Sequence, residues 1–308
     1  MEQPLASRWL APGAFILLGL IWGSSFLWIK IALEEIPPAT LVAYRMSLGA
    51  IGMLLLLAFI GQSMPRRARE LLPLAILGAV NAGLPIFLIS WGELYVDSGT
   101  AAVLNSLVPI FSLIIAGLML RTEPVTALRV IGLLLGFAGA ALLASRELAL
   151  SGDPQALIGA LAVVVAAISY AAGASFAKYQ IRTTHRYVVA AGTLVFAAIY
   201  TWLLALVTDG FIIPTVPSTL VAVVWLGLLG SFVAYVCYFF LIERQGATVA
   251  SMVTYIFPVV GVGLGVVFLG ELLEWRLIVG TLLVLVGIVV VGLRYDTAVT
   301  RALGWARR

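Results

Sequence analysis

The sequence predicts an all-α integral membrane protein with ten transmembrane helices, arranged as two inverted repeats of five helices each. Three observations lead to this fold class. Hydrophobic residues make up 63% of the chain and charged residues only 10%, whereas soluble domains carry about 25% charged residues. Apolar runs of about 20 residues, each able to cross roughly 30 Å of hydrocarbon, follow one another with short polar connections. The second half of the chain also repeats features of the first.

The expected spans follow one another closely, and none of the connections is long enough to form a further domain. The first apolar run is longer than the core of a signal peptide and is followed by further spans, so we expect it to remain in the protein. We divide the chain into a first repeat (1–147), a second repeat (148–297) and a basic cytoplasmic tail (298–308). The spans are expected near residues 10–32, 39–60, 71–95, 98–119, 126–145, 156–178, 187–208, 218–242, 248–269 and 276–294.

The distribution of basic residues predicts the orientation in the membrane. Most arginines and lysines fall in or beside alternate connections, and only Lys30, Arg146 and Arg276 fall on the opposite side. By the positive-inside rule both termini are then cytoplasmic, in a bacterial inner (plasma) membrane. The net charge of +4 is explained by this asymmetry, so we expect no nucleic-acid partner.

The internal repeat is clearest in two proline-containing segments, residues 101–112 and 250–261. At a constant offset Pro109 falls on Pro258, and in both segments polar side chains lie about one helical turn before the proline. A proline inside a helix removes an N–H and disturbs the preceding turn. Such a disturbed turn is stable within a membrane only where neighbouring helices or a cavity satisfy its free backbone groups. Because five spans per repeat invert the second half, the two defects predict a substrate pathway at the repeat interface.

The chain also resembles a known family. Residues 21–45 (IWGSSFLWIKIALEEIPPATLVAYR), 97–143 and 247–291 are similar to the EamA-type transporters of the drug/metabolite transporter superfamily, in particular to exporters of aromatic and neutral amino acids. The resemblance spans nearly the whole chain. It implies ten helices in two inverted halves, a central cavity, no cofactor, and export or exchange of small metabolites such as amino acids.

Candidate substrate contacts are polar and aromatic residues expected in mid-membrane. Asn81 is a full amide that is costly in lipid without partners, and Ser231, Tyr235 and Tyr238 are spaced to share one helix face. The alternative for each is that it ties or packs neighbouring helices. The full set of candidates is Trp22, Ser25, Asn81, Asn105, Ser106, Tyr170, Ser231, Tyr235, Tyr238, Thr254 and Tyr255.

A second group of residues is expected to act in gating or in structure: Arg45, Glu93, Pro109 and Pro258. Arg45 lies about two turns into the second span, where an intramembrane cation suggests a functional role; the alternatives are a structural role near the outer gate or a side chain that extends its head to the outer interface. Glu93 ends the third span, and we expect its carboxylate to be hydrated; the alternatives are a gate charge or a proton site. The many glycines of the last spans of each half are expected to allow close helix packing.

These features favour a transporter of small amphipathic metabolites, most of all amino acids, that works by alternating access without ion coupling. A proton-coupled antiporter of metabolites or drugs is the alternative. An integral membrane enzyme is disfavoured, because the chain has one histidine, one cysteine and no mid-span carboxylate cluster or metal-ligand set. A non-transporting receptor would leave the internal polar face unexplained. The expected partners are a small-molecule substrate and membrane lipid, with the protein a monomer or weak homodimer.

Overall fold

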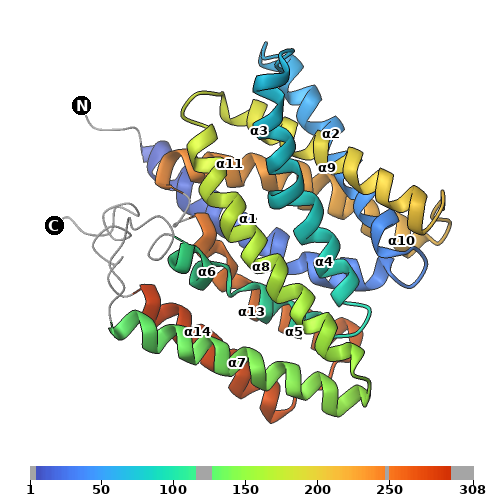
Figure 1. The fold of residues 1–308 in the computed structure, drawn as a ribbon, viewed down its shortest axis with the longest axis vertical. Coiled ribbons are helices and arrows are strands. Elements are labelled where there is room, and N and C mark those ends of the chain that lie inside the picture. The colour runs from blue at the N-terminus through green and yellow to red at the C-terminus, as the bar shows by residue number, and fades with distance from the viewer. Residues whose placement is uncertain (1–4, 116–126, 247–249, 293–308) are drawn as a thin grey trace.

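The computed structural model describes residues 5–115, 127–246 and 250–292, and every regular element in these ranges is helical (Figure 1). The tail predicted at 298–308 lies outside the described residues. The first half contains α1 (Leu5–Ala32), α2 (Pro38–Phe59), α3 (Ala68–Gly78), η1 (Ala79–Gly83), α4 (Leu84–Gly92), α5 (Ser98–Asn105), α6 (Val108–Ile114) and α7 (Ala127–Ser151). The second half contains α8 (Gln155–Gln180), α9 (Arg186–Thr208), α10 (Pro217–Val224), η3 (Trp225–Val233), α11 (Ala234–Gln245), η4 (Met252–Ile256), α13 (Phe257–Leu269) and α14 (Trp275–Gly292).

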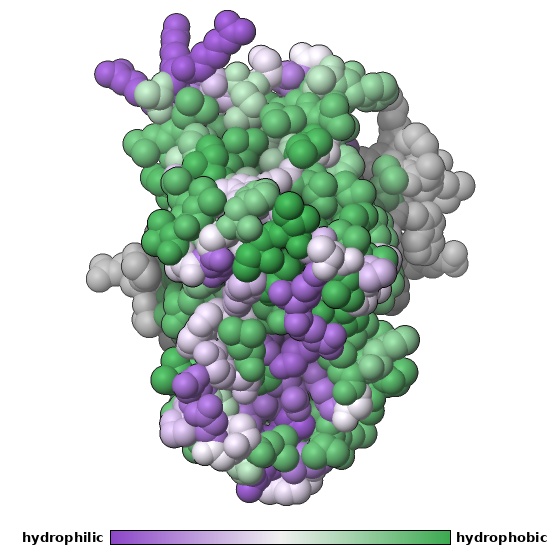
Figure 2. All heavy atoms as spheres, turned by 90° about the vertical axis from the view of Figure 1, so that its right-hand side faces the viewer, coloured by the Kyte–Doolittle hydropathy of each residue, from purple (hydrophilic) through white to green (hydrophobic). Residues whose placement is uncertain are grey.

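The helices have the length and surface of an integral membrane protein. In the described ranges eight continuous helical stretches are long and apolar enough to span a bilayer, and Ser98–Ile114 and Trp275–Val290 are shorter apolar stretches. Large apolar side chains point outward from them, for example Phe59 (88% exposed) and Val207 (86% exposed). Figure 2 shows hydrophobic atoms over most of one face, with hydrophilic residues gathered in its lower half. Such a surface is soluble in lipid and not in water.

Two long helices contain π-helical segments near their middle. In the first half η1 separates α3 from α4, and in the second half η3 separates α10 from α11. A π-helical turn accommodates an extra residue and alters which carbonyl groups are available to outside donors. These segments therefore change which side chains share a face of the helix.

The two proline-containing segments are interrupted at the positions that the sequence predicts. Helix α5 ends at Asn105 and α6 starts at Val108, one residue before Pro109. In the second half the 3₁₀ segment η4 precedes α13, and Pro258 lies in the first turn of α13. A proline is favourable in a first helical turn, where its missing N–H would have no helical partner.

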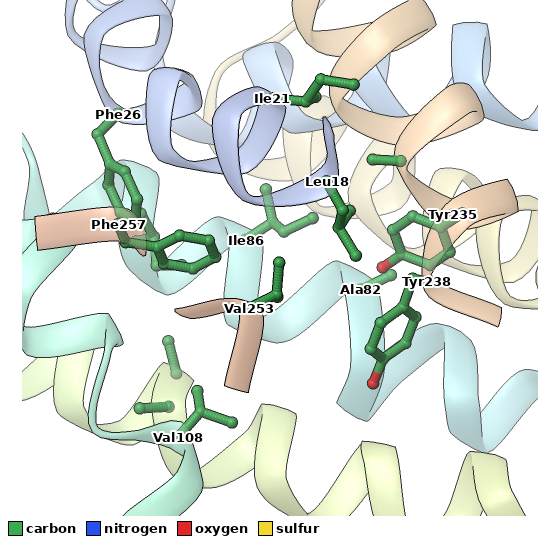
Figure 3. Packing of buried hydrophobic residues seen from close by; sticks show 14 of the residues in the cluster. Leu18, Ile21, Phe26, Ala82, Ile86, Val108, Tyr235, Tyr238, Val253 and Phe257 are labelled. Carbon is green, nitrogen blue, oxygen red and sulfur yellow. The ribbon is translucent and has the colours of Figure 1, made fainter. Parts of the chain in front are cut away.

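The halves interlock through their first helices. Helix α1 packs on α11, η4 and α13 of the second half, while α8 packs on α4, α5 and α6 of the first. The buried core runs through this junction, and Figure 3 shows Phe26 of α1 beside Phe257 of α13, with ring centres 5.8 Å apart. Any space enclosed at the junction is consequently lined by both halves.

Glycines bring α7 and α14 into close contact, as predicted. A Cβ atom on Gly139 would lie 2.7 Å from the carbonyl oxygen of Gly280, and one on Gly287 would lie 2.6 Å from that of Gly132. Gly263 is an exception, because no atom would lie within 4 Å of its Cβ. The α7–α14 pair therefore cannot accept larger residues at these crossing points without moving apart.

Candidate functional site

A cavity lies at the junction of the two halves. It encloses about 610 Å³ of space between protein atoms, including the part that is open to the outside. The cavity is lined by Trp22, Ser25, Phe26, Ile29, Arg45, Ile86, Ile89, Asn105, Val108, Tyr170, Ala174, Tyr238, Ala250, Ser251, Val253, Thr254 and Phe257.

Arg45 is the permanently charged residue of this lining. It projects from α2, is 3% exposed, and donates from Nε to Ser231 Oγ and from Nη2 to the Gly230 carbonyl, both at 3.1 Å. Trp22 Nε1 donates to the same carbonyl at 2.9 Å. Gly230 lies in η3, and the π-helical turn gives its carbonyl oxygen two side-chain donors from the first half. This contact fixes the guanidinium within the cavity wall.

Aromatic rings form one side of the cavity. The Trp22 ring lies 5.3 Å from that of Tyr238 and 6.4 Å from that of Phe257, measured between ring centres. Tyr170 lines the cavity from α8, the helix of the second half that corresponds to α1. Figure 3 shows Tyr235 and Tyr238 projecting from the same helix. Rings of this kind offer apolar area and electron-rich faces that can attract a cation.

The two proline-containing segments contact each other at the cavity. Thr254 Oγ1 donates to the Ser251 carbonyl at 2.9 Å and lies 3.5 Å from the carbonyl oxygen of Ser106. Asn105 is 4% exposed and lines the cavity, and its Oδ1 has no hydrogen-bond partner among the described residues. A buried amide oxygen without a donor favours a ligand that supplies one.

Six predicted substrate contacts, namely Trp22, Ser25, Asn105, Tyr170, Tyr238 and Thr254, thus lie in the cavity wall, together with Arg45. The other five do not line it: Asn81, Ser106, Ser231, Tyr235 and Tyr255.

Bonds between helices account for much of this second set. Ser231 accepts from Arg45, and the Tyr235 hydroxyl donates to the Asn81 carbonyl at 2.7 Å. Ser106 Oγ donates to the Val103 carbonyl at 2.6 Å. The Asn81 amide is buried beside Gly173 of α8 and has no partner in the described part of the chain. For Ser231 and Tyr235 the alternative reading, as links between helices, fits these contacts better than substrate contact does, whereas the Ser106 hydroxyl bonds within its own segment.

Several residues that line the cavity are not among those predicted from the sequence. Ser251 lies one turn before Thr254, and that spacing is a signal that could have identified it. The apolar members, such as Ile86, Val108 and Val253, carry no signal, because apolar residues are expected at every position of a membrane helix. These apolar residues make most of the cavity wall hydrophobic.

The structure corrects the expectation that Glu93 is hydrated. Its side chain is fully buried, and neither carboxylate oxygen has a hydrogen-bond partner among the described residues. The ammonium of Lys30 donates to the backbone carbonyls of Glu93 and Val96, not to the carboxylate. Glu93 does not line the cavity. Glu243, at the end of α11, is by contrast exposed and paired with Arg186.

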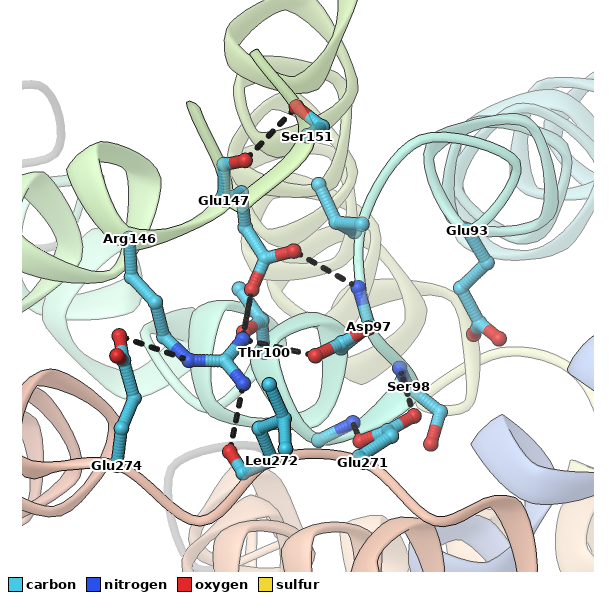
Figure 4. A network of polar contacts seen from close by, with 12 residues as sticks. Glu93, Asp97, Ser98, Thr100, Arg146, Glu147, Ser151, Glu271, Leu272 and Glu274 are labelled. Carbon is cyan, nitrogen blue, oxygen red and sulfur yellow. Dashed lines mark hydrogen bonds and ion pairs between the residues drawn. The ribbon is translucent and has the colours of Figure 1, made fainter. Parts of the chain in front are cut away.

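A second correction concerns Arg146, which the sequence places in a polar connection. Helix α7 continues to Ser151, so Arg146 lies within this helix. Its side chain is fully buried in the protein. Its guanidinium contacts Glu147, Asp97 (2.9 Å) and Glu274 (3.5 Å) and donates to the Leu272 carbonyl at 2.8 Å (Figure 4). We call these five residues the Arg146 network. It joins α5 and α7 to the connection between α13 and α14.

Glu271 reinforces the same junction. Its carboxylate accepts from the backbone N–H groups of Ser98 (2.6 Å) and Gly99 (2.9 Å), at the start of α5. A carboxylate at a helix N-terminus satisfies unpaired donors and interacts favourably with the helix dipole. Gly270 allows this placement, because its φ of 69° ends α13 in the left-handed conformation. The second half therefore caps a helix of the first.

Comparison with known proteins identifies this architecture. Residues 10–145 and 157–293 each match the EamA-like transporter family. The chain belongs to this family. As an EamA member of the drug/metabolite transporter superfamily it is a membrane transporter and not an enzyme.

Relatives of the EamA protein extend over most of its length. It is 32% identical to an uncharacterized inner membrane transporter YedA of Escherichia coli K12, over 91% of this chain and 90% of YedA. It is 30% identical to the uncharacterized transporter YoaV of Bacillus subtilis, over 87% and 92%. It is 27% identical to a probable terminal-alkyne amino-acid exporter of Streptantibioticus cattleyicolor, over 91% and 93%. A solved crystal structure shares the fold at a TM-score of 0.68 and 22% identity, covering 95% of this chain and 98% of the other.

Proposed function

We propose that this EamA protein exports or exchanges small amphipathic metabolites, above all amino acids, through the central cavity by alternating access. The observation that carries the proposal is the composition of the cavity wall. Apolar and aromatic side chains alternate with a few polar groups, and they come from helices of both halves. A site shared by two halves is reached from either side when the halves rock against each other.

Amino acids are the leading class of substrate for two reasons. The described lining contains one permanent charge, Arg45, beside neutral hydroxyl and amide groups, which suits an uncharged or zwitterionic molecule better than a multiply charged one. One relative is named as a probable amino-acid exporter. We extend that property to this chain as part of the proposal.

We further propose ten spans in two inverted repeats, with both termini cytoplasmic in a bacterial inner membrane. Matching interruptions in the two halves support the repeat: η1 with η3, and the break before Pro109 with η4 before Pro258. The bias of basic residues supports the orientation, and YedA is named as an inner membrane transporter. A monomer or weak homodimer, with lipid as its surroundings and no nucleic-acid partner, completes the proposal.

We propose that movement needs no ion gradient. Proton-driven carriers usually hold an ionisable group that proton and substrate both contest. Apart from tyrosine phenols, the ionisable residue of the described lining is Arg45, which keeps its proton in proteins. Glu93 is buried, so hydration of its carboxylate is no longer a reason to exclude it as a proton site. Its position outside the cavity wall is a different reason, because substrate in the cavity does not contact it. Proton-coupled antiport through Glu93 remains the alternative function.

Reconstitution tests the proposal. Purified protein in liposomes loaded with a labelled neutral amino acid should release it down its gradient, without a pH difference or membrane potential. Unlabelled substrate outside should accelerate the release. Absence of flux for every amino acid, together with absence of any ligand-induced thermal stabilisation across amino acids and other metabolites, would favour a non-transporting role.

A further inference from the structure

Arg45 is a buried cation without a counter-ion. None of the carboxylates in the described residues lies within ion-pair distance of it, although the field of Glu93 reaches it. An isolated charge inside a membrane protein is costly unless it is paired or used. Since Arg45 lines the cavity, the missing counter-ion has space to arrive as part of a ligand.

The guanidinium is held ready for such a ligand. Of its five N–H donors, one on Nε and one on Nη2 are occupied by Ser231 and Gly230. The remaining donors, including both on Nη1, have no hydrogen-bond partner in the described ranges. Two bonds to a single segment, η3, fix the plane of the group. A carboxylate could therefore be bound without reorganising the side chain, through charge-assisted hydrogen bonds.

The same cavity also provides a place for a positive group. Asn105 Oδ1 is a buried acceptor without a donor among the described residues, and the rings of Trp22 and Tyr238 belong to the same cavity lining. The hydroxyl groups of Ser25 and Thr254 already donate to backbone carbonyls, at 3.1 and 2.9 Å, so that they are left as acceptors. Acceptors and aromatic faces together favour an ammonium group.

We propose that Arg45 binds the carboxylate of a zwitterionic α-amino acid and that Asn105 accepts from its ammonium group. The apolar part of the wall, which includes Phe26, Ile86 and Phe257, then receives an aliphatic or aromatic side chain. The inference rests on the proposed function and assigns the recognition elements within that cavity. It changes Arg45 from an outer-gate residue to a residue that contacts substrate.

The test compares ligands that share one side chain. Leucine carries both charged groups, leucinol lacks the carboxylate, and 4-methylpentanoate lacks the ammonium. Each is tested for inhibition of labelled leucine efflux from proteoliposomes and for thermal stabilisation of the purified protein. The parent should respond to leucine at concentrations about tenfold to a hundredfold lower than to either analogue, the factor expected for one charge-assisted hydrogen bond.

Two variants separate the ends of the ligand. In Arg45→Gln the preference for leucine over leucinol should disappear. In Asn105→Leu the preference for leucine over 4-methylpentanoate should become smaller. Damage to folding would weaken all ligands equally and leave these ratios unchanged. If Arg45→Gln does not fold, Arg45→Lys keeps the charge and should keep the preference at reduced affinity. Arg182→Gln, an exposed arginine on the connection after α8, is the matched control.

Each outcome of these measurements supports or overturns one part of the proposed site. An unchanged leucine-to-leucinol ratio in Arg45→Gln, or loss of the preference in Arg45→Lys, would overturn the carboxylate site. If the parent binds 4-methylpentanoate as tightly as leucine, the ammonium site is wrong. If no amino acid is moved or bound, but 4-methylpentanoate stabilises the parent and not Arg45→Gln, the amino-acid function fails while the anion site stands. If none of the three ligands acts through Arg45, the inference is overturned.

Discussion

Removal of Arg146 should destabilise the protein far more than removal of an exposed arginine. In Arg146→Leu the buried carboxylate of Glu147, whose side chain is 5% exposed, loses its counter-ion. Breaking a buried ion pair on one side typically costs about 3–5 kcal/mol. The carboxylates of Asp97 and Glu274 are 29% and 32% exposed, so water can partly replace their partner and they add little.

Thermal unfolding in detergent, followed by tryptophan fluorescence, measures the effect. A loss of about 3–5 kcal/mol corresponds to a fall in the melting temperature on the order of 10 °C. The control Arg182→Leu removes an exposed charge and should change stability by no more than about 0.5 kcal/mol. Both variants exchange the same residue types, so the difference isolates burial and pairing.

A double variant tests the physical cause. Arg146→Leu combined with Glu147→Leu removes the unpaired buried charge, and it should be less destabilised than the sum of the two single changes. Equal melting temperatures for Arg146→Leu and Arg182→Leu would refute the assignment of the Arg146 network as a buried link between the halves. Strict additivity in the double variant would show that lost packing, not the isolated charge, causes the effect.

Three further predictions follow from the structure. With the single cysteine replaced by alanine, an impermeant thiol reagent outside the cell should label Asp153→Cys, and Thr183→Cys only after permeabilisation; the reverse would invert the proposed orientation. Desolvation opposes ionisation of Glu35, but hydrogen bonds from Thr215, Thr219 and the Val216 backbone together outweigh it and lower the pKa of Glu35 to about 2. Its stabilising contribution is therefore complete above about pH 4.5 and lost as the pH falls towards 2, so melting temperatures of the parent and Glu35→Gln should differ at pH 6 and converge in acid. Finally, Glu93→Gln should leave substrate exchange and gradient-driven efflux unchanged, whereas loss of proton-driven uphill movement in that variant would establish proton coupling.

Properties that depend on the chain locally could be predicted from the sequence. The membrane environment follows from composition, since long apolar helices are stable only in lipid. The interruptions before Pro109 and Pro258 follow from the missing N–H of proline, which no tertiary contact can restore. Close packing at Gly139 and Gly280 follows from the absence of a side chain. These features belong to individual residues and their immediate neighbours.

Tertiary structure decided which polar groups face the cavity. A regular helix would place Ser231, Tyr235 and Tyr238 on one face. In the structure Ser231 lies within η3 and accepts from Arg45, Tyr235 donates to the Asn81 carbonyl, and Tyr238 lines the cavity. Burial of Arg146 depends on carboxylates from three separate segments. The sequence alone determined the kind of solvent and the places where helices break, because both depend on local chemistry. The distant partners of the buried charges, such as Asp97 and Leu272 for Arg146 and Ser231 for Arg45, were decided only by the fold, because they lie far away in the chain.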